Sequence, residues 1–177
     1  MNIVVAALYL SLGFATSAVA QDSTTALAAT AACGPRNIRF NVKEDPAKHP
    51  TPQLDPDKAV VYVIQDLGEF VCVGCAITTR VGMDGAWVGA NHGSSYFFFT
   101  TTPGEHHLCA NWQSRFGTRN RSFAMANFTA EAGRVYYFRI RLLLSRSIYY
   151  FELEAVNSDQ GKYLVASSPF STSHPQN

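Results

Sequence analysis

The sequence carries little charge, and the charges nearly cancel. Asp, Glu, Lys and Arg make up 15% of the 177 residues, and the formal net charge is +1. A nucleic-acid-binding domain would normally be strongly basic, so we expect no nucleic acid among the partners. Hydrophobic residues make up 47%, which suits a chain with a folded core and argues against disorder.

Helical patterns and catalytic signatures are also scarce. Beyond the first twenty residues, no stretch of normal helix length has the periodicity of a helix. No G-x-S-x-G elbow raises a nucleophilic serine, and no βαβ pattern surrounds Cys72 as it would in a thioredoxin-like protein. We therefore expect no enzyme activity and no cofactor.

A long apolar run occurs at the N-terminus alone. Residues 3–15 are apolar but too few to cross a bilayer as an ordinary helix, and Ala-Val-Ala at 18–20 offers a small-x-small cleavage pattern. We expect residues 1–20 to be a signal peptide, with no transmembrane helix after cleavage. The protein would then be secreted, or held in the periplasm or cell envelope. The alternatives are an uncleaved N-terminal anchor and a lipid attached to Cys33.

Export changes how the four cysteines are interpreted, because an oxidising compartment favours disulfides. Four cysteines allow three pairings, and the sequence leaves these open. The candidates are Cys33, Cys72, Cys75 and Cys109. A zinc ion held by Cys72, Cys75 and His106 is the rival interpretation. Because this spacing matches no familiar zinc module, we expect no metal.

The chain is rich in aromatic residues and tight turns. Twelve Phe, eight Tyr and two Trp favour strands. Asp84-Gly85 lies between two apolar runs and predicts a hairpin. Pro103-Gly104 predicts a second hairpin, between residues 96–101 and 105–112. Residues 59–65 are nearly all apolar, which is typical of a strand buried on both faces.

Residues 134–144 and 147–156 predict two further strands, paired about a turn at Ser145-Arg146. The predicted partners are Tyr137–Glu154, Phe138–Leu153, Arg139–Glu152, Ile140–Phe151 and Arg141–Tyr150. A slip of one residue would bury Glu152 and Glu154, so the pattern specifies which face each side chain occupies.

These patterns predict an all-β fold, an antiparallel β-sandwich of about eight strands with a short C-terminal helix and flexible ends. Residues 21–57 form a Ser/Ala- and Pro-rich N-terminal segment with a short strand at 38–42. Residues 58–157 form the sandwich, and residues 158–177 form the short helix, at 159–166, and a tail.

Several segments resemble a known family. They read KAVVYVIQD, VGMDGAWVG, TTPGEHHLCANW and FTAEAGRVYYFR. Over residues 59–156 they resemble the exported bacterial family catalogued as domain of unknown function 2846. Residues 81–112 are also similar to PEGA-type surface β-modules. Both resemblances imply an envelope-associated β-sandwich, and neither carries over any catalytic residue.

Arginine is concentrated in one stretch. Residues 115–146 contain seven arginines and one acidic residue, a local charge of 7 − 1 = +6. Arginine engages carboxylate and phosphate through two donors, so this stretch could bind an anionic envelope polysaccharide or another envelope protein. Alternatively, the arginines pair with acids on a solvated sheet face. The candidate binding residues are Arg115, Arg119, Arg121, Tyr137, Arg139, Arg141 and Tyr150. Tyr96 or Phe98, on another face, could extend this surface.

A non-enzymatic binding module is the first functional hypothesis. One alternative is a small hydrolase or metal-dependent enzyme, and another is a structural accessory that pairs through an open sheet edge. The candidate groups for an enzyme are Asp84, His92, Ser94, Ser95, His106 and His107, with the cysteine pair. Because His106 and His107 are adjacent on a predicted strand, we expect one imidazole packed under the turn and the other exposed.

Overall fold

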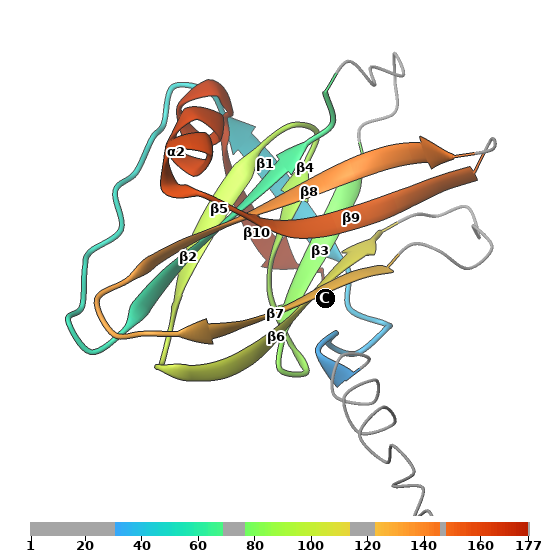
Figure 1. Cartoon of the computed structure of the whole chain (residues 1–177). Helices are drawn as coiled ribbons and strands as arrows, with labels where there is room; N and C mark the ends of the chain where they lie inside the picture. The colour runs from blue at the N-terminus through green and yellow to red at the C-terminus, as the bar shows by residue number, and fades with distance from the viewer. Residues whose placement is uncertain (1–30, 69–76, 114–122, 146–147, 177) are drawn as a thin grey trace, which may run out of the picture.

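The computed structural model describes residues 31–68, 77–113, 123–145 and 148–176. Within these residues the chain forms ten strands and one helix, α2 (Ser158–Ser167). Figure 1 labels these elements. The strands are β1 (Phe40–Asp45), β2 (Ala59–Asp66), β3 (Thr78–Met83), β4 (Ala86–His92), β5 (Tyr96–Thr101), β6 (Gly104–Trp112), β7 (Phe123–Ala130), β8 (Val135–Ser145), β9 (Ile148–Val156) and β10 (Phe170–Pro175).

The described strands form two sheets packed face to face, which confirms the predicted all-β sandwich. One sheet has the order β1-β10-β5-β2-β8-β9, and the other has the order β4-β3-β6-β7. The first sheet is mixed, because β2 runs parallel to β8 and β10 runs parallel to β5. A parallel neighbour requires a long crossover, and the chain makes the β2–β8 crossover by building the second sheet in between.

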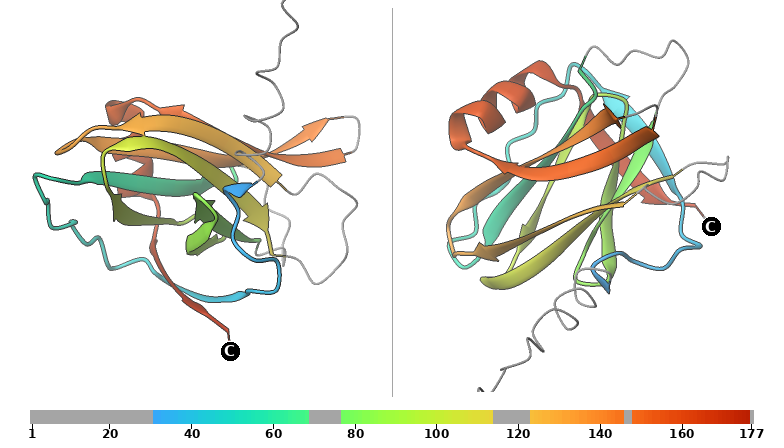
Figure 2. Two further views of the ribbon diagram at one scale, coloured as in Figure 1. Left: turned by 90° about the horizontal axis from the view of Figure 1, so that it is seen from below. Right: turned by 45° about the vertical axis from the view of Figure 1, so that its right-hand side comes forward.

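Strand β2 lies inside the six-stranded sheet and is buried on both faces, as predicted. Val61 and Val63 pack in the core between the sheets. Tyr62 and Ile64 point to the opposite, outer face, where they pack with Leu164 of α2. Figure 2 shows the helix lying over this side of the sheet. The two faces of β2 are therefore covered by different layers.

The two predicted tight turns have different outcomes. Asp84 and Gly85 both have positive φ, 52° and 90°, as a type I′ turn requires, and they connect β3 to β4 in the predicted hairpin. The hairpin predicted at Pro103-Gly104 is wrong, because β5 and β6 belong to different sheets. Phe97 and Phe99 of β5 pack in the core between the sheets, and this turn carries the chain from one sheet to the other.

Strands β8 and β9 pair as predicted in direction and in faces, but the predicted register is wrong by two residues. Arg139 lies opposite Glu154, and Arg141 lies opposite Glu152. Both guanidinium groups approach their carboxylates to 2.5 Å. The predicted register gave a carboxylate partner to Arg139 but not to Arg141. The observed register pairs both, and cross-strand charge pairs contribute roughly 0.2–1 kcal/mol each.

The C-terminal residues include a strand that the sequence did not reveal. The predicted short helix is confirmed as α2, with Asn157 as its N-cap. The predicted tail is wrong, because residues 170–175 form β10, which pairs along β1 (Figure 2). The Ser171 hydroxyl also donates to the Ser95 hydroxyl at 2.7 Å. The six-stranded sheet therefore includes β1 and β10, which lie outside residues 58–157.

Residues 32–38, which we call the strap, cross the outer face of the four-stranded sheet. A disulfide joins Cys33 of the strap to Cys109 of β6, with Cα atoms 5.2 Å apart. This finding selects one partner for each of these cysteines from the three pairings left open. A lipid on Cys33 is incompatible with the disulfide, because both would use the same sulfur. Gly34 lies against the Trp87 ring, where a Cβ atom would overlap the indole.

Arg80 of β3 binds the backbone of the strap. Its side chain is buried, and its guanidinium donates hydrogen bonds to the backbone oxygens of Arg36 and Ile38. A further bond goes to the side-chain oxygen of Asn111, and the guanidinium carbon lies 4.4 Å from the centre of the Trp87 ring. Burial lowers the pKa of Arg80 from its usual value. The cation is thus held by neutral oxygens and an aromatic face.

Gly161→Ala tests how α2 docks on the sheet, because a Cβ atom at this position would overlap the Tyr137 ring. An alanine at an open helix position would stabilise the protein by about 1 kcal/mol. We expect the steric overlap to outweigh the gain in helix propensity and to lower the free energy of unfolding by about 1–3 kcal/mol in urea titrations. Tyr163→Ala, at a position 68% exposed, should change it by less than about 0.5 kcal/mol. A stabilised Gly161→Ala variant would contradict the docking.

The double substitution Cys33→Ser/Cys109→Ser tests the strap. The disulfide closes a long loop, with a sequence separation of 76 residues, so its loss should lower the free energy of unfolding by roughly 2–4 kcal/mol. Peptide mapping without reductant should recover one cross-linked peptide pair containing these two cysteines. Recovery of Cys33 linked to a different cysteine would show that the strap is attached elsewhere.

Candidate functional site

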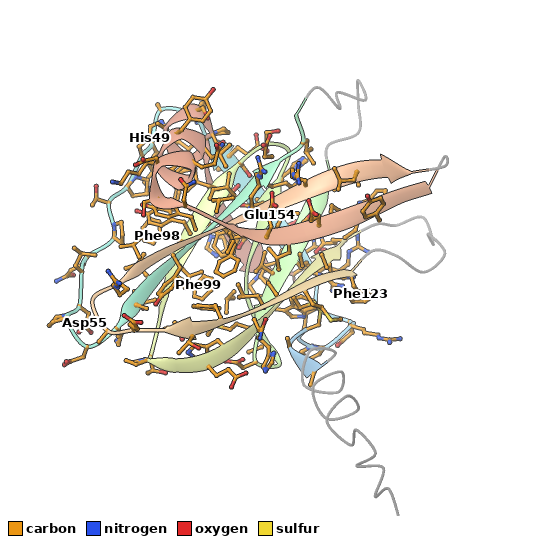
Figure 3. The ribbon with its side chains drawn as sticks, in the orientation of Figure 1. His49, Asp55, Phe98, Phe99, Phe123 and Glu154 are labelled. Atoms are coloured by element: carbon orange, nitrogen blue, oxygen red, sulfur yellow. A yellow bond between two sulfur atoms is a disulfide. The ribbon has the colours of Figure 1, made fainter. Side chains whose placement is uncertain are left out.

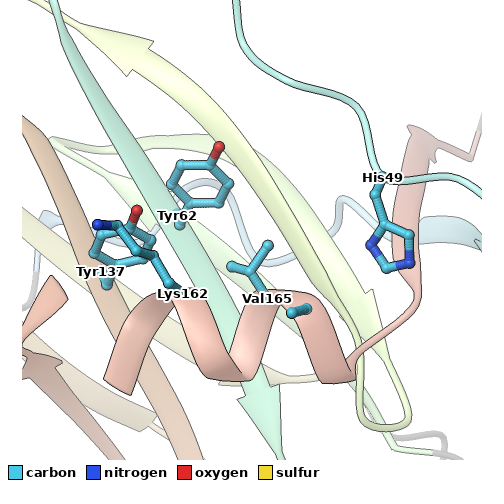
Figure 4. Close-up of a pocket in the computed structure, with 6 residues that line it drawn as sticks. His49, Tyr62, Tyr137, Lys162 and Val165 are labelled. Atoms are coloured by element: carbon cyan, nitrogen blue, oxygen red, sulfur yellow. The ribbon is translucent and has the colours of Figure 1, made fainter. Parts of the chain in front are cut away.

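A hollow of about 390 Å³ lies between α2, the outer face of the six-stranded sheet and the loop that precedes β2 (Figure 4). We call it the α2 hollow. Its lining residues are His49, Tyr62, Tyr137, Lys162, Val165 and Ala166. Tyr62 and Tyr137 lie side by side because β2 and β8 are parallel neighbours with these two residues in register. The volume falls within the range of roughly 300–1,000 Å³ that is usual for small-ligand sites.

The floor of the α2 hollow is an aromatic cluster. The Tyr62 and Tyr137 rings stack with centroids 5.1 Å apart and an angle of 17° between their planes. Phe98 packs on the other side of Tyr62, with centroids 5.4 Å apart, and Gly161 covers Tyr137 from the helix. Because these neighbours occupy the ring faces, the two tyrosines present their edges and hydroxyl groups to the hollow.

The hydroxyl groups of this cluster keep their protons at neutral pH. Burial, together with the nearby Tyr137 and Tyr96, raises the pKa of Tyr62 to about 12. Burial also raises the pKa of Tyr96 and of Tyr137. Within the described part of the chain, neither the Tyr62 nor the Tyr137 hydroxyl has a hydrogen-bond partner. Both are therefore O–H groups free to bind a ligand.

The opposite walls come from the loop and from the helix. His49 stacks on Tyr96, with ring centroids 6.2 Å apart and planes at 17°, and its Nδ1 lies 3.5 Å from the Tyr96 hydroxyl. Figure 3 shows His49 and Phe98 on the side of the molecule where α2 lies. Lys162 is exposed on α2 and forms no ion pair with any other described residue. The lining residues include no carboxylate.

The predicted arginine surface is distributed differently. Arg139 is paired with Glu154 at 2.5 Å and with Asp66 at 3.7 Å, and Arg141 is paired with Glu152 at 2.5 Å. Neighbouring acids thus compensate both charges, which is the alternative that the sequence left open. The remaining arginine candidates, Arg115, Arg119 and Arg121, lie outside the described residues.

The candidate tyrosines do not meet. Tyr137 and Tyr150 share the outer face, but Tyr150 lies opposite Leu143, six residues along β8 from Tyr137. At about 3.3 Å per residue, this separation is roughly 20 Å. Tyr96 and Phe98, expected on another face, instead share the cluster with Tyr137. The tyrosine that lies beside Tyr137 is Tyr62, with ring centroids 5.1 Å apart.

Sequence reasoning selected Tyr137 alone among the six lining residues, and it missed the polar groups of Tyr62, His49 and Lys162. A usable signal was the tyrosine within a strand buried on both faces, because that strand needs a cover on its outer side. Helix α2 is the single helix of the described residues and provides that cover. No local pattern marks His49, which lies in a Pro-rich loop.

His106 forms a clasp between two turns. Its Nδ1 lies 2.6 Å from an Asp84 oxygen, and its Nε2 lies 2.8 Å from the Thr102 backbone oxygen. The other Asp84 oxygen accepts a hydrogen bond from the His107 N–H at 2.9 Å. Because both ring nitrogens face acceptors, both carry protons. His106 is buried under the turn, as expected for one of the two histidines, whereas His107 is half-buried.

Opposing effects act on the pKa of His106. Burial by itself lowers it, but the hydrogen bonds to Asp84 and Thr102 and the charge of Asp84 together raise it above the ordinary value of 6.5. The Thr101 hydroxyl lies 3.1 Å from Nε2 of His106. Because Nε2 donates its proton to the Thr102 backbone oxygen, His106 cannot act as a base toward this hydroxyl, and Thr101 is also buried. The arrangement is a structural clasp between the turns.

The other proposed catalytic and metal groups are not assembled. Asp84 lies in the turn before β4 and His92 ends that strand, so the two side chains cannot meet in one triad with Ser94 or Ser95. Within the described residues, no group of three or more His, Cys, Asp and Glu side chains is placed to hold a metal ion. Cys72 and Cys75 lie outside those residues. No described helix has the length and apolar character needed to cross a membrane.

A comparison with protein-family models finds no matching family, and a comparison with curated proteins finds no match. The resemblance to the exported family and to PEGA-type modules therefore stays a prediction.

The clasp predicts a pH dependence of stability. The folded state binds the His106 proton more tightly than the unfolded chain, so this stabilisation is fully present below about pH 6.5 and is lost as the pH rises through the raised pKa. Asp84→Asn removes the charge, and asparagine tolerates the positive φ of this turn. We expect its free energy of unfolding, measured in urea from pH 5 to 8, to fall less steeply than that of the wild type.

His174→Gln, at an exposed position on β10, is the control and should keep the wild-type slope. Parallel pH profiles for Asp84→Asn and the wild type would show that His106 is not held as an imidazolium.

Proposed function

We propose that the protein is an exported, non-catalytic binding module of the bacterial cell envelope, and that it holds a segment of envelope polysaccharide in the α2 hollow. The observation that carries this proposal is the hollow itself. Two strands, a loop and a helix supply its walls, and the Tyr62 and Tyr137 hydroxyls have no partner within the described residues. Surfaces of this kind, apolar with a few convergent polar groups, are typical of ligand sites.

Two observations support export. The Cys33–Cys109 disulfide is consistent with an oxidising compartment, since cytosolic thiols are normally kept reduced. The apolar run at 3–15 and the Ala-Val-Ala pattern at 18–20 have the form of a secretory signal. Together they favour a location outside the cytoplasm.

The lining suits a sugar. A pyranose ring combines hydroxyl groups with apolar C–H patches, and it needs both kinds of contact at once. Tyr62 and Tyr137 supply hydroxyl groups beside aromatic edges, while Val165 and Ala166 supply apolar surface from the helix. A ring of this size fits a hollow of about 390 Å³.

Ala166→Trp tests the α2 hollow by filling it from an exposed position on the helix. We expect the mature protein to bind a subset of glycans on an envelope-glycan array. The affinity of Ala166→Trp for these glycans should be lower than that of the wild type by a factor of at least about ten, because the indole occupies the ligand's volume.

Tyr163→Trp adds a tryptophan to the same helix outside the α2 hollow and should bind like the wild type. Urea titrations would confirm that both variants fold. An array with no bound glycan, or equal binding by folded Ala166→Trp, would refute the proposed function.

A further inference from the structure

The side chains that line the α2 hollow offer many donors and few acceptors. Tyr62 and Tyr137 each present a hydroxyl group, and Lys162 presents an ammonium with three N–H donors. The Tyr96 hydroxyl faces Nδ1 of His49. When that hydroxyl donates, the proton of the neutral imidazole lies on Nε2, which makes His49 a further donor. The two phenolic oxygens are the acceptors that remain.

The charge of the lining has one sign. Lys162 is a cation, and none of the lining residues is Asp or Glu. Asp159 lies one turn before Lys162 on α2, yet the two form no ion pair, and no other described residue pairs with Lys162. The cations Arg139 and Arg141 on the neighbouring sheet face are each held by a carboxylate. An unpaired cation beside free donors matches a ligand that brings its own negative charge.

We propose that the α2 hollow recognises an acidic saccharide, whose carboxylate or phosphate group accepts hydrogen bonds from Lys162, Tyr62 and Tyr137. This inference rests on the proposed function and adds the chemical class of the sugar. A neutral sugar can accept hydrogen bonds from these donors through its hydroxyl oxygens, but it brings no negative charge to the Lys162 ammonium. An acidic substituent brings charged acceptors, and an ammonium–carboxylate hydrogen bond is stronger than one between the ammonium and a neutral hydroxyl.

Binding of defined probes to the mature protein tests this inference. The probes are trigalacturonate, the neutral trisaccharide galactotriose, mannose 6-phosphate and inorganic phosphate, each measured by titration calorimetry at low salt. We expect an acidic sugar to bind about tenfold more tightly than galactotriose, and its binding to weaken as salt is added. Preference for trigalacturonate or for mannose 6-phosphate identifies the acidic group as a carboxylate or a phosphate, and either result supports the inference.

Lys162→Gln tests the cation directly. It should weaken binding of the preferred acidic probe about tenfold and leave galactotriose binding unchanged. Lys43→Gln, which removes an exposed lysine from β1, is the matched control and should bind like the wild type. Because Lys162 is exposed, we expect the variant to keep the wild-type free energy of unfolding.

The remaining outcomes separate the two proposals. Equal binding of acidic and neutral sugars, unaffected by Lys162→Gln but lost in Ala166→Trp, would overturn the acidic class and leave the polysaccharide site standing. Inorganic phosphate binding as tightly as the acidic sugars would overturn recognition of a saccharide. If no probe binds and the glycan array is also empty, both proposals are wrong.

Discussion

The burial of both faces of β2 is the constraint on which the rest of the structure depends. Val61 and Val63 need a layer on the inner face, and Tyr62 and Ile64 need one on the outer face. Full burial of each aliphatic side chain stabilises the fold by about 1.5–3 kcal/mol. The inner layer is the four-stranded sheet, which the chain builds between β2 and β8. The outer layer is α2, which the chain adds after the last strand of the β8–β9 pair.

The candidate site follows from an incomplete outer layer. Gly161 lets α2 approach the Tyr137 ring closely, while the adjoining flank of the helix, with Lys162, Val165 and Ala166, leaves a space beside the loop that carries His49. The aromatic cluster beneath that space belongs to the fold, since it packs against Leu164 and Phe170. The Tyr62 and Tyr137 hydroxyl groups and the Lys162 ammonium have no partner among the described residues. The same layer therefore stabilises the sheet with its inner atoms and presents polar atoms to solvent.

Much of the fold could be predicted from local patterns. The Asp84-Gly85 turn, the buried strand at β2 and the short helix each depend on a few consecutive residues, and all three are confirmed. Features set by distant parts of the chain were missed. Pro103-Gly104 has the local chemistry of a hairpin turn. The strands on its two sides, β5 and β6, nevertheless pair with strands of different sheets.

The same distinction applies to β10 and to the site. Strand β10 has little apolar periodicity, and its pairing with β1 defines it. The β8–β9 register keeps the predicted faces, because alternation specifies them, but a shift of two residues leaves that alternation unchanged. The α2 hollow joins Tyr62, Tyr137, His49 and Lys162 from four separate segments, so no spacing in the sequence could reveal it. The buried tyrosine in β2 was the one local indication.

The most direct test of the central claim is a nuclear Overhauser measurement on the mature protein in solution. If α2 covers the outer face of β2 and β8, the Hα protons of Gly161 should show cross-peaks to the ring protons of Tyr137, since the two residues are in contact. A helix that forms but shows no such cross-peaks would lie away from the sheet, and neither the second face of β2 nor the α2 hollow would then exist as described.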